Sequence, residues 1–99
     1  MVAVVAFVHG VHGAFGISFP DFPGCIAGAE TVDETLRRGR DALEFHVEAM
    51  IEVGETLPKI RDIAEVRADP AYADDFVDAF VANIDIDGSG PERSERYSL

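Results

Sequence analysis

The side chains best suited to metal or nucleophilic chemistry are three histidines and one cysteine, namely His9, His12, His46 and Cys25. His9 and His12 share one expected turn, but their spacing matches no structural zinc site. We interpret His46 as a hydrogen-bonded histidine at the edge of the core, and Cys25 as a small buried hydrophobe. A lone cysteine forms no intrachain disulfide. The sequence therefore predicts no metal centre and no cofactor site.

The carboxylates offer a weaker alternative. Asp85 and Asp87 are two residues apart in an expected strand, so they would share one face of a sheet. We interpret them as a solvated strand end, with a weak cation site as the alternative. A phosphate cradle is not expected either, because no glycine-rich segment joins an expected strand to an expected helix. Gly10, Gly13 and Gly16 surround an expected hairpin instead.

The charge balance favours a basic partner. Asp and Glu number 19 against 8 Lys and Arg, for a formal net charge of −11. Such a chain repels phosphate backbones and anionic lipids, so general binding to nucleic acid or to a membrane surface is not expected. A basic protein is the natural complement, and solubility alone is the alternative explanation of the charge.

The length and the N-terminus bound the class of protein. Ninety-nine residues, 47% of them hydrophobic, suffice for one domain with one core. The apolar run at residues 1–8 is too short to span a bilayer and lacks the basic flank of a signal peptide. We therefore expect a cytoplasmic protein.

Three strands are expected in the first third of the chain. Residues 2–9 are β-branched and aromatic without interruption, which indicates a buried strand. Residues 9–13 predict a turn, and the alternation of Phe15, Ile17 and Phe19 predicts a second, half-buried strand that pairs with the first as an antiparallel hairpin. The short segment 25–30 is expected to form a third, edge-type strand.

A long helix is expected next. Thr31 and Glu34 fit a capping box, and Gly54 fits the position just beyond the C-terminus of the helix. The helix would have about six turns at 3.6 residues per turn. Its apolar stripe contains Val32, Leu36, Leu43, Val47 and Met50. Its opposite face contains Glu34, Arg38, Asp41, Glu48 and Glu52.

Phe45 interrupts the polar face of this helix, about 180° from Leu36. An aromatic side chain there should be covered by something other than the core of its own helix. We predict a partner-binding surface formed by Asp41, Phe45, Glu48 and Glu52. The alternative is an ordinary exposed phenylalanine, or one covered by the C-terminal segment.

The last third is expected to return to the sheet. Residues 60–69 fit either a short helix or a loop, and Asp69 would cap a one-turn helix that begins with Pro70. Residues 76–87 also fit a helical stripe, but the alternation of their C-terminal half favours a strand. Residues 89–99 are expected to be a flexible polar tail after a domain that spans residues 1–88.

These elements predict an α+β domain of β-β-β-α-β order, with a three-stranded antiparallel sheet, one long helix and a returning fourth strand. The helix would pack on one face of the sheet. A single helix would leave the other face open, so we expect a homodimer or a tetramer.

Several segments of the chain resemble a known family. Residues 15–25, Phe-Gly-Ile-Ser-Phe-Pro-Asp-Phe-Pro-Gly-Cys, resemble the GVSFPDLPGC segment of HicB-like antitoxins. Residues 31–34, 42–48 and 52–58 resemble the helix of that family and its exit. The likeness runs from about Val4 to Asp87.

The resemblance implies a partial ribonuclease-H-like fold and an antitoxin that binds and masks a small basic mRNA-cleaving toxin of the HicA type. Many relatives also carry a C-terminal DNA-binding domain, which residues 91–99 could at most begin. A ribonuclease-H site needs several carboxylates, one usually on the first strand, and residues 2–9 contain none, so no enzyme is expected. The alternative function is an orphan, self-assembling interaction domain without enzymatic activity.

Overall fold

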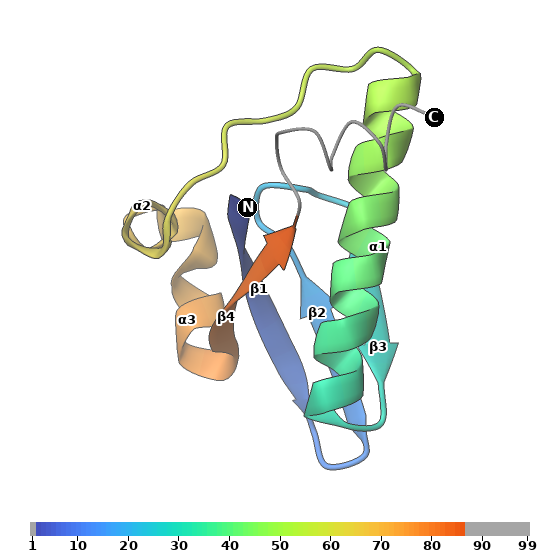
Figure 1. Ribbon diagram of the computed structural model, residues 1–99. Coiled ribbons are helices and arrows are strands. Elements are labelled where there is room, and N and C mark those ends of the chain that lie inside the picture. The colour runs from blue at the N-terminus through green and yellow to red at the C-terminus, as the bar shows by residue number, and fades with distance from the viewer. Residues whose placement is uncertain (1, 87–99) are drawn as a thin grey trace.

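The computed structural model describes residues 2–86, in which a four-stranded antiparallel sheet separates one long helix from two short ones (Figure 1). The elements are β1 (Val2–Val11), β2 (Ala14–Ser18), β3 (Ile26–Ala29), α1 (Val32–Glu52), α2 (Ile63–Arg67), the 3-10 turn η1 (Pro70–Tyr72), α3 (Ala73–Asp78) and β4 (Phe80–Ile86). The strand order is β3-β2-β1-β4. The predicted α+β class and the returning fourth strand are confirmed.

The first strand lies in the middle of the sheet, between β2 and β4. Both of its faces are buried, which explains its uninterrupted apolar sequence. The strand is longer than predicted, because Gly10 and Val11 still pair with β2 and only His12 and Gly13 form the turn. The prediction that Gly10 belongs to the turn is wrong. Its φ of +128° belongs to the strand end, where a Cβ atom would meet the Ala14 carbonyl.

The helix α1 begins almost as predicted. The Thr31 hydroxyl accepts a hydrogen bond from the backbone N–H of Glu34 at 3.1 Å. The second half of the capping box is not formed, because the Glu34 carboxylate accepts a hydrogen bond from Arg37 Nη1 at 2.7 Å instead. One side-chain cap therefore satisfies one of the backbone N–H groups that this end of the helix leaves without an intrahelical partner.

The predicted end of α1 at Gly54 is confirmed. Gly54 has a φ of +79°, its N–H donates to the Ile51 carbonyl at 3.1 Å, and the Glu55 N–H donates to the Met50 carbonyl at 2.9 Å. These two bonds form a Schellman motif, which satisfies the last carbonyls of the helix. The motif also fixes the direction in which Glu55 leaves the helix.

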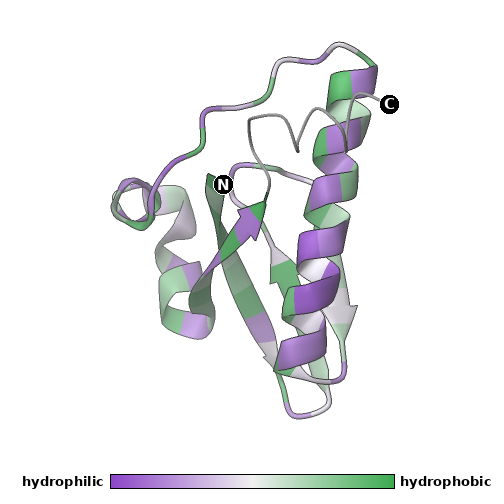
Figure 2. Cartoon of the chain, in the orientation of Figure 1, coloured by the Kyte–Doolittle hydropathy of each residue, from purple (hydrophilic) through white to green (hydrophobic). Residues whose placement is uncertain are grey.

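The main core lies between α1 and the sheet. Figure 2 shows hydrophilic residues along the outer side of α1 and hydrophobic ones along the strands. Leu43 and Val47 of α1 pack on Val4, Ala6 and Val8 of β1, as the apolar stripe predicts. The buried members of this cluster also include Ile17, Phe19, Phe22, Cys25, Ile84 and Ile86.

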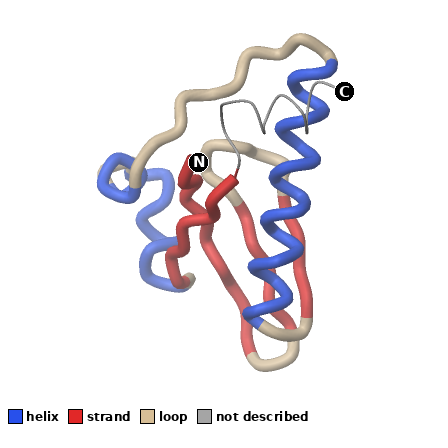
Figure 3. The backbone as a smooth tube through the Cα atoms, viewed as in Figure 1, coloured by secondary structure: helices blue, strands red, loops and turns tan. Residues whose placement is uncertain are grey.

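The second face of the sheet is not open as expected. The long loop after α1 carries the chain to the other side of the sheet, where α2, η1 and α3 follow (Figure 3). Val66 and Phe76 from these helices pack on Val5 and Phe7 of β1, and the rings of Phe7 and Phe76 meet edge to face at 5.0 Å. The predicted reason for self-association, an uncovered sheet face, is therefore wrong over this part of the sheet.

In the last third of the chain, the structure corrects one predicted element and decides between the two alternatives for another. Residues 76–78 belong to α3, not to a strand, and β4 begins at Phe80. Phe76 is placed in the helix α3, from which its ring contacts the Phe7 ring on the second face of the sheet. Residues 63–67 are helical, with Asp62 and Glu65 forming a full capping box, and Asp69 caps η1 as predicted. The predictions for Asp87 and for residues 88–99 lie outside the described residues.

Candidate functional site

The four predicted partner-binding residues lie on one side of α1. Successive helical residues are about 100° apart, so Asp41, Glu48 and Glu52 fall within about 60° of Phe45. Phe45 is 73% exposed, and Asp41 and Glu52 are exposed as well. Nothing in residues 2–86 covers the aromatic ring. The structure thus brings an apolar side chain and three carboxylates onto one accessible surface.

The charged residues of α1 differ in whether they form ion pairs. Glu34 pairs with Arg37 at 2.7 Å and with Arg38 at 3.7 Å, and Glu44 lies 3.9 Å from Arg40. The carboxylates of Asp41, Glu48 and Glu52 form no ion pair with any residue between 2 and 86. The predicted surface therefore carries negative charge that the described residues do not compensate.

The helix dipole makes this arrangement unfavourable in the isolated protein. The last turn of α1 contains Glu52 and no basic residue. The C-terminus of a helix carries partial negative charge, so a carboxylate there costs about 0.3–1 kcal/mol at low ionic strength. A cation brought by a partner would offset that cost.

An apolar stripe accompanies the acidic residues. Phe45, Ala49 and Val53 follow one another at intervals of four, and Val53 is 70% exposed. Each step of four rotates about 40° around the helix, so the stripe turns from the solvent side toward the loop between β2 and β3. Sequence reasoning identified Phe45 alone. The spacing of four that links it to Val53 was available in the sequence.

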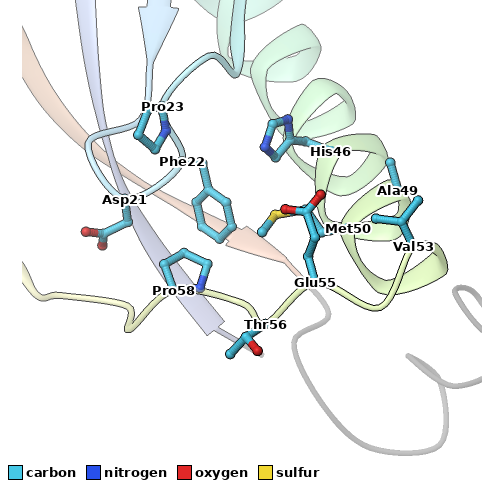
Figure 4. A pocket seen from close by; sticks show the side chains of 10 residues that line it. All are labelled: Asp21, Phe22, Pro23, His46, Ala49, Met50, Val53, Glu55, Thr56 and Pro58. Atoms are coloured by element: carbon cyan, nitrogen blue, oxygen red, sulfur yellow. The ribbon is translucent and has the colours of Figure 1, made fainter.

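The stripe leads into a groove of about 560 Å³ between the C-terminal half of α1, the β2–β3 loop and the segment after α1 (Figure 4). Phe22 and Met50 line it from the loop and the helix, and Pro58 lines it from the following segment. Val53 stands at the end of the stripe that reaches the groove. Residues from the ranges 15–25, 42–48 and 52–58, which carry most of the family resemblance, therefore meet at one cavity.

His46 stands at the wall of this groove. The half-buried imidazole meets the Phe22 ring edge to face, with 6.0 Å between ring centroids. The predicted position at the core edge is correct. The predicted hydrogen bond is absent within residues 2–86, where an aromatic contact takes its place.

A buried carboxylate holds the loop that forms one wall of the groove. Asp21 Oδ2 accepts a hydrogen bond from the Arg61 backbone N–H at 2.8 Å, and Oδ1 accepts one from Arg61 Nε at 2.6 Å. In Figure 4 the Asp21 carboxylate points away from the groove. The hydrogen bond to Asp21 also raises the pKa of the Arg61 guanidinium, which keeps it charged. Sequence reasoning missed this pair, because no short-range pattern links residues so distant in the chain.

Glu55 supplies the acidic group at the opening of the groove. The Schellman motif at the end of α1 directs the chain back, and Figure 4 shows the carboxylate of Glu55 pointing toward Met50 and His46. Glu55 is exposed and forms no ion pair with any residue of the described range. The groove thus combines apolar walls with one unpaired negative charge.

The other residues singled out for chemistry lie apart from this groove. His9 Nε2 lies 3.4 Å from Asp75 Oδ1, beside α3, and Asp85 is exposed on β4. Burial raises the pKa of the Cys25 thiol, which makes the nucleophilic thiolate scarcer. Within residues 2–86, no three or more His, Cys, Asp and Glu side chains group closely enough to hold a metal ion. None of the helices in that range is long and apolar enough to cross a membrane.

The sequence matches the family model described as a HicB-like antitoxin of bacterial toxin–antitoxin systems over residues 4–97. It is 36% identical over 67 residues to an uncharacterized 14.9 kDa protein from the rep–hol intergenic region of Haemophilus phage HP1. That match covers 68% of this chain but only 50% of the phage protein, so the chain spans about half of that relative.

Two solved structures share the fold. The crystal structure of the N-terminal domain of the Burkholderia pseudomallei antitoxin HicB is similar with a TM-score of 0.71 and 31% identity, covering 88% of this chain and 100% of that domain. A chain in a structure of a HicA3 and HicB3 toxin–antitoxin complex is similar with a TM-score of 0.70 and 23% identity, covering 88% of this chain and 100% of that one.

Proposed function

We propose that this chain, which belongs to the HicB-like antitoxin family of bacterial toxin–antitoxin systems, binds and masks a small basic mRNA-cleaving toxin of the HicA type. Members of this family are antitoxins and not enzymes. A related chain occurs in a HicA3 and HicB3 complex, which supports the class of partner. Because mRNA is the proposed target of the toxin, we place the action of this chain in the cytoplasm.

The observation that carries the proposal is the surface formed by Asp41, Phe45, Glu48 and Glu52. It joins an exposed aromatic ring to carboxylates that have no cation among residues 2–86. An apolar anchor surrounded by charge of one sign is the arrangement expected at the centre of an interface with a partner of the opposite sign. The net charge of −11 would also accelerate association with a basic protein.

A pull-down from the native cells tests this function. The tagged chain should retain a basic protein of under ~100 residues, the size of one small domain. Intact-mass analysis should show the two proteins in stoichiometric amounts. That protein should cleave RNA once it is separated from this chain, and the cleavage should stop when this chain is added back. A chain that is recovered alone, or with a partner that leaves RNA intact, would contradict the proposal.

The expected homodimer or tetramer is a second proposal, and the edge of β4 supports it. At the other edge of the sheet, Arg38 Nη1 donates a hydrogen bond to the Gly28 carbonyl of β3 at 3.2 Å, which hinders strand addition there. Within residues 2–86, no side chain forms a hydrogen bond with the β4 backbone, and Phe80 of that strand is 45% exposed. Sedimentation that shows only a monomer of about 10.7 kDa at high micromolar concentration would remove this proposal.

A further inference from the structure

We propose that the groove beside α1 receives one arginine or lysine side chain of the partner, with its aliphatic stem between Phe22, Met50 and Pro58 and its cationic end at Glu55. The choice of a basic side chain rests on the proposed function, since a basic toxin supplies it. The groove extends the predicted surface, because the apolar stripe from Phe45 to Val53 leads directly into it.

The walls suit the stem of a long side chain. Phe22 is 2% exposed and forms a fixed aromatic wall, while Met50 lines the opposite side with a flexible thioether. A methionine adapts its shape to whatever enters, and arginine and lysine bury their methylene stems along such surfaces. The volume of about 560 Å³ exceeds the needs of one side chain, so the guest would keep part of its hydration.

The polar groups at the opening select for positive charge. The Glu55 carboxylate points over the groove and is unpaired within the described residues, whereas the Asp21 carboxylate on the far side of the loop is already bonded to Arg61. An anionic guest would be repelled by Glu55, and a purely apolar guest would desolvate that carboxylate without giving it a partner. A guanidinium or ammonium group avoids both penalties, because it is attracted by the Glu55 carboxylate and can donate hydrogen bonds to it.

The groove is held open before any guest arrives. The β2–β3 loop is fixed by the Phe22 N–H bond to the Phe19 carbonyl at 3.0 Å and by the two Asp21–Arg61 bonds. The helix side is fixed by the Schellman motif, which also sets the direction of Glu55. A site whose walls are already ordered binds with a smaller entropy cost.

A titration of the isotope-labelled protein followed by NMR tests the inference without the toxin. The probes are N-acetyl-arginine methylamide and N-acetyl-citrulline methylamide, which have similar shapes but differ in charge. Arginine should shift the amide signals of Ala49, Val53 and Thr56 in a saturable way, and citrulline should bind about three- to fivefold more weakly, as the loss of one exposed ion pair predicts. Equal shifts with both probes, or arginine shifts spread over the whole acidic surface, would overturn the inference.

Two variants of equal charge separate the groove from long-range attraction. Glu55→Gln should abolish the preference for arginine over citrulline. Glu30→Gln, an exposed carboxylate before the first turn of α1, removes the same charge far from the groove and should leave the preference intact. If the two variants behave alike, the groove is not the binding site. If no basic protein is retained in the pull-down while the arginine preference persists, the proposed function fails and the groove stands.

Discussion

Asp21 and Arg61, forty residues apart in the chain, are joined by two hydrogen bonds, one to the backbone N–H and one to the side chain of the arginine. The Asp21 side chain is 3% exposed, so both bonds lie largely away from water. Arg61 also donates to Asp69 at 3.1 Å and lies over the ring of Tyr72. One ionic contact thus connects the β2–β3 loop to the segment that crosses to the second face of the sheet.

Asp21→Asn should therefore destabilise the protein by about 1.5–3 kcal/mol, the usual contribution of hydrogen bonds to a charged group. The amide keeps the size of the side chain but loses the charge that holds the guanidinium. Urea denaturation would measure the loss. Asp69→Asn removes the negative charge from a more exposed ion pair of the same arginine and should cost less. Equal losses in the two variants would show that the buried contact is not the main one.

Leu43 and Phe45 form a matched pair on opposite sides of α1. Leu43 is fully buried, so Leu43→Ala should lower the free energy of unfolding by about 2–5 kcal/mol. Phe45 is 73% exposed, so Phe45→Ala should change stability by less than about 0.5 kcal/mol while weakening the retention of the basic partner. A large loss of stability from Phe45→Ala would mean that the ring is covered in solution.

Gly39 reverses an ordinary expectation for helices. Alanine in place of a mid-helix glycine usually stabilises by about 0.5–1 kcal/mol. Here a Cβ atom would lie 2.7 Å from Ile17 Cδ1 and 2.8 Å from Ile17 Cγ2, because α1 packs closely on β2 at this point. We expect Gly39→Ala to destabilise by about 1–3 kcal/mol, the usual range for overpacking.

The neighbouring isoleucine provides the control for that variant. Ile17→Val removes the Cδ1 atom, so the loss caused by Gly39→Ala should be smaller in the Ile17→Val background. Calorimetry or urea denaturation of the four proteins of this cycle gives the coupling. A coupling near zero would show that the Cδ1 contact is not the source of the strain.

Glu52 should exchange stability for binding. Glu52→Gln removes a carboxylate from the negative end of the α1 dipole and should raise the free energy of unfolding by about 0.3–1 kcal/mol at low salt. The same change should weaken binding to the basic partner, because the surface loses one of its unpaired charges. Thermal melts and a binding titration at two salt concentrations would measure both effects. A Glu52→Gln variant that is less stable than the wild type and binds the partner equally tightly would contradict both expectations.

Glu65 gives the protein a defined response to acid. The backbone hydrogen bond from Asp62 and the contact with Lys59 hold the pKa of the Glu65 carboxyl below its ordinary value. A lowered pKa in the folded state contributes stability that is complete above the unfolded value of about 4.3 and is lost as the pH falls through the folded value. The stability difference between the wild type and Glu65→Gln should thus be largest at neutral pH and shrink below about pH 4.3. Urea denaturation of both proteins at several pH values would measure this difference. A difference in stability that stays constant with pH would show that the linkage is absent.

The sequence was most informative where patterns are local. Thr31 and Gly54 bracket α1 by their preferences for helix caps, and the stripe from Leu36 to Met50 identifies its buried side. Phe45 stands out because it breaks that periodicity. These signals act within a few residues, so they can be read without knowledge of the rest of the fold.

The features that sequence reasoning missed depend on contacts between distant residues. Phe76 fits a strand as well as a helix by pattern, and only its packing on Phe7, a residue of β1 far away in the chain, decides for the helix. The groove likewise requires the β2–β3 loop to meet the exit of α1, which the Asp21–Arg61 contact secures. Neither contact has a short-range signature, so the cover of the second sheet face and the groove both had to come from the structure.

The central position of β1 has a consequence for synthesis. Of the four strands of this sheet, β1 leaves the ribosome first. It pairs on one side with β2, which follows within a few residues, but its partner on the other side is β4, where Val2 pairs with Ile86. At translation rates of about 5–20 residues per second, that side stays without its partner for on the order of ten seconds. During this time an apolar strand presents a free edge on which another nascent chain could pair. The order of the strands thus makes the newborn chain more prone to aggregation than the finished protein.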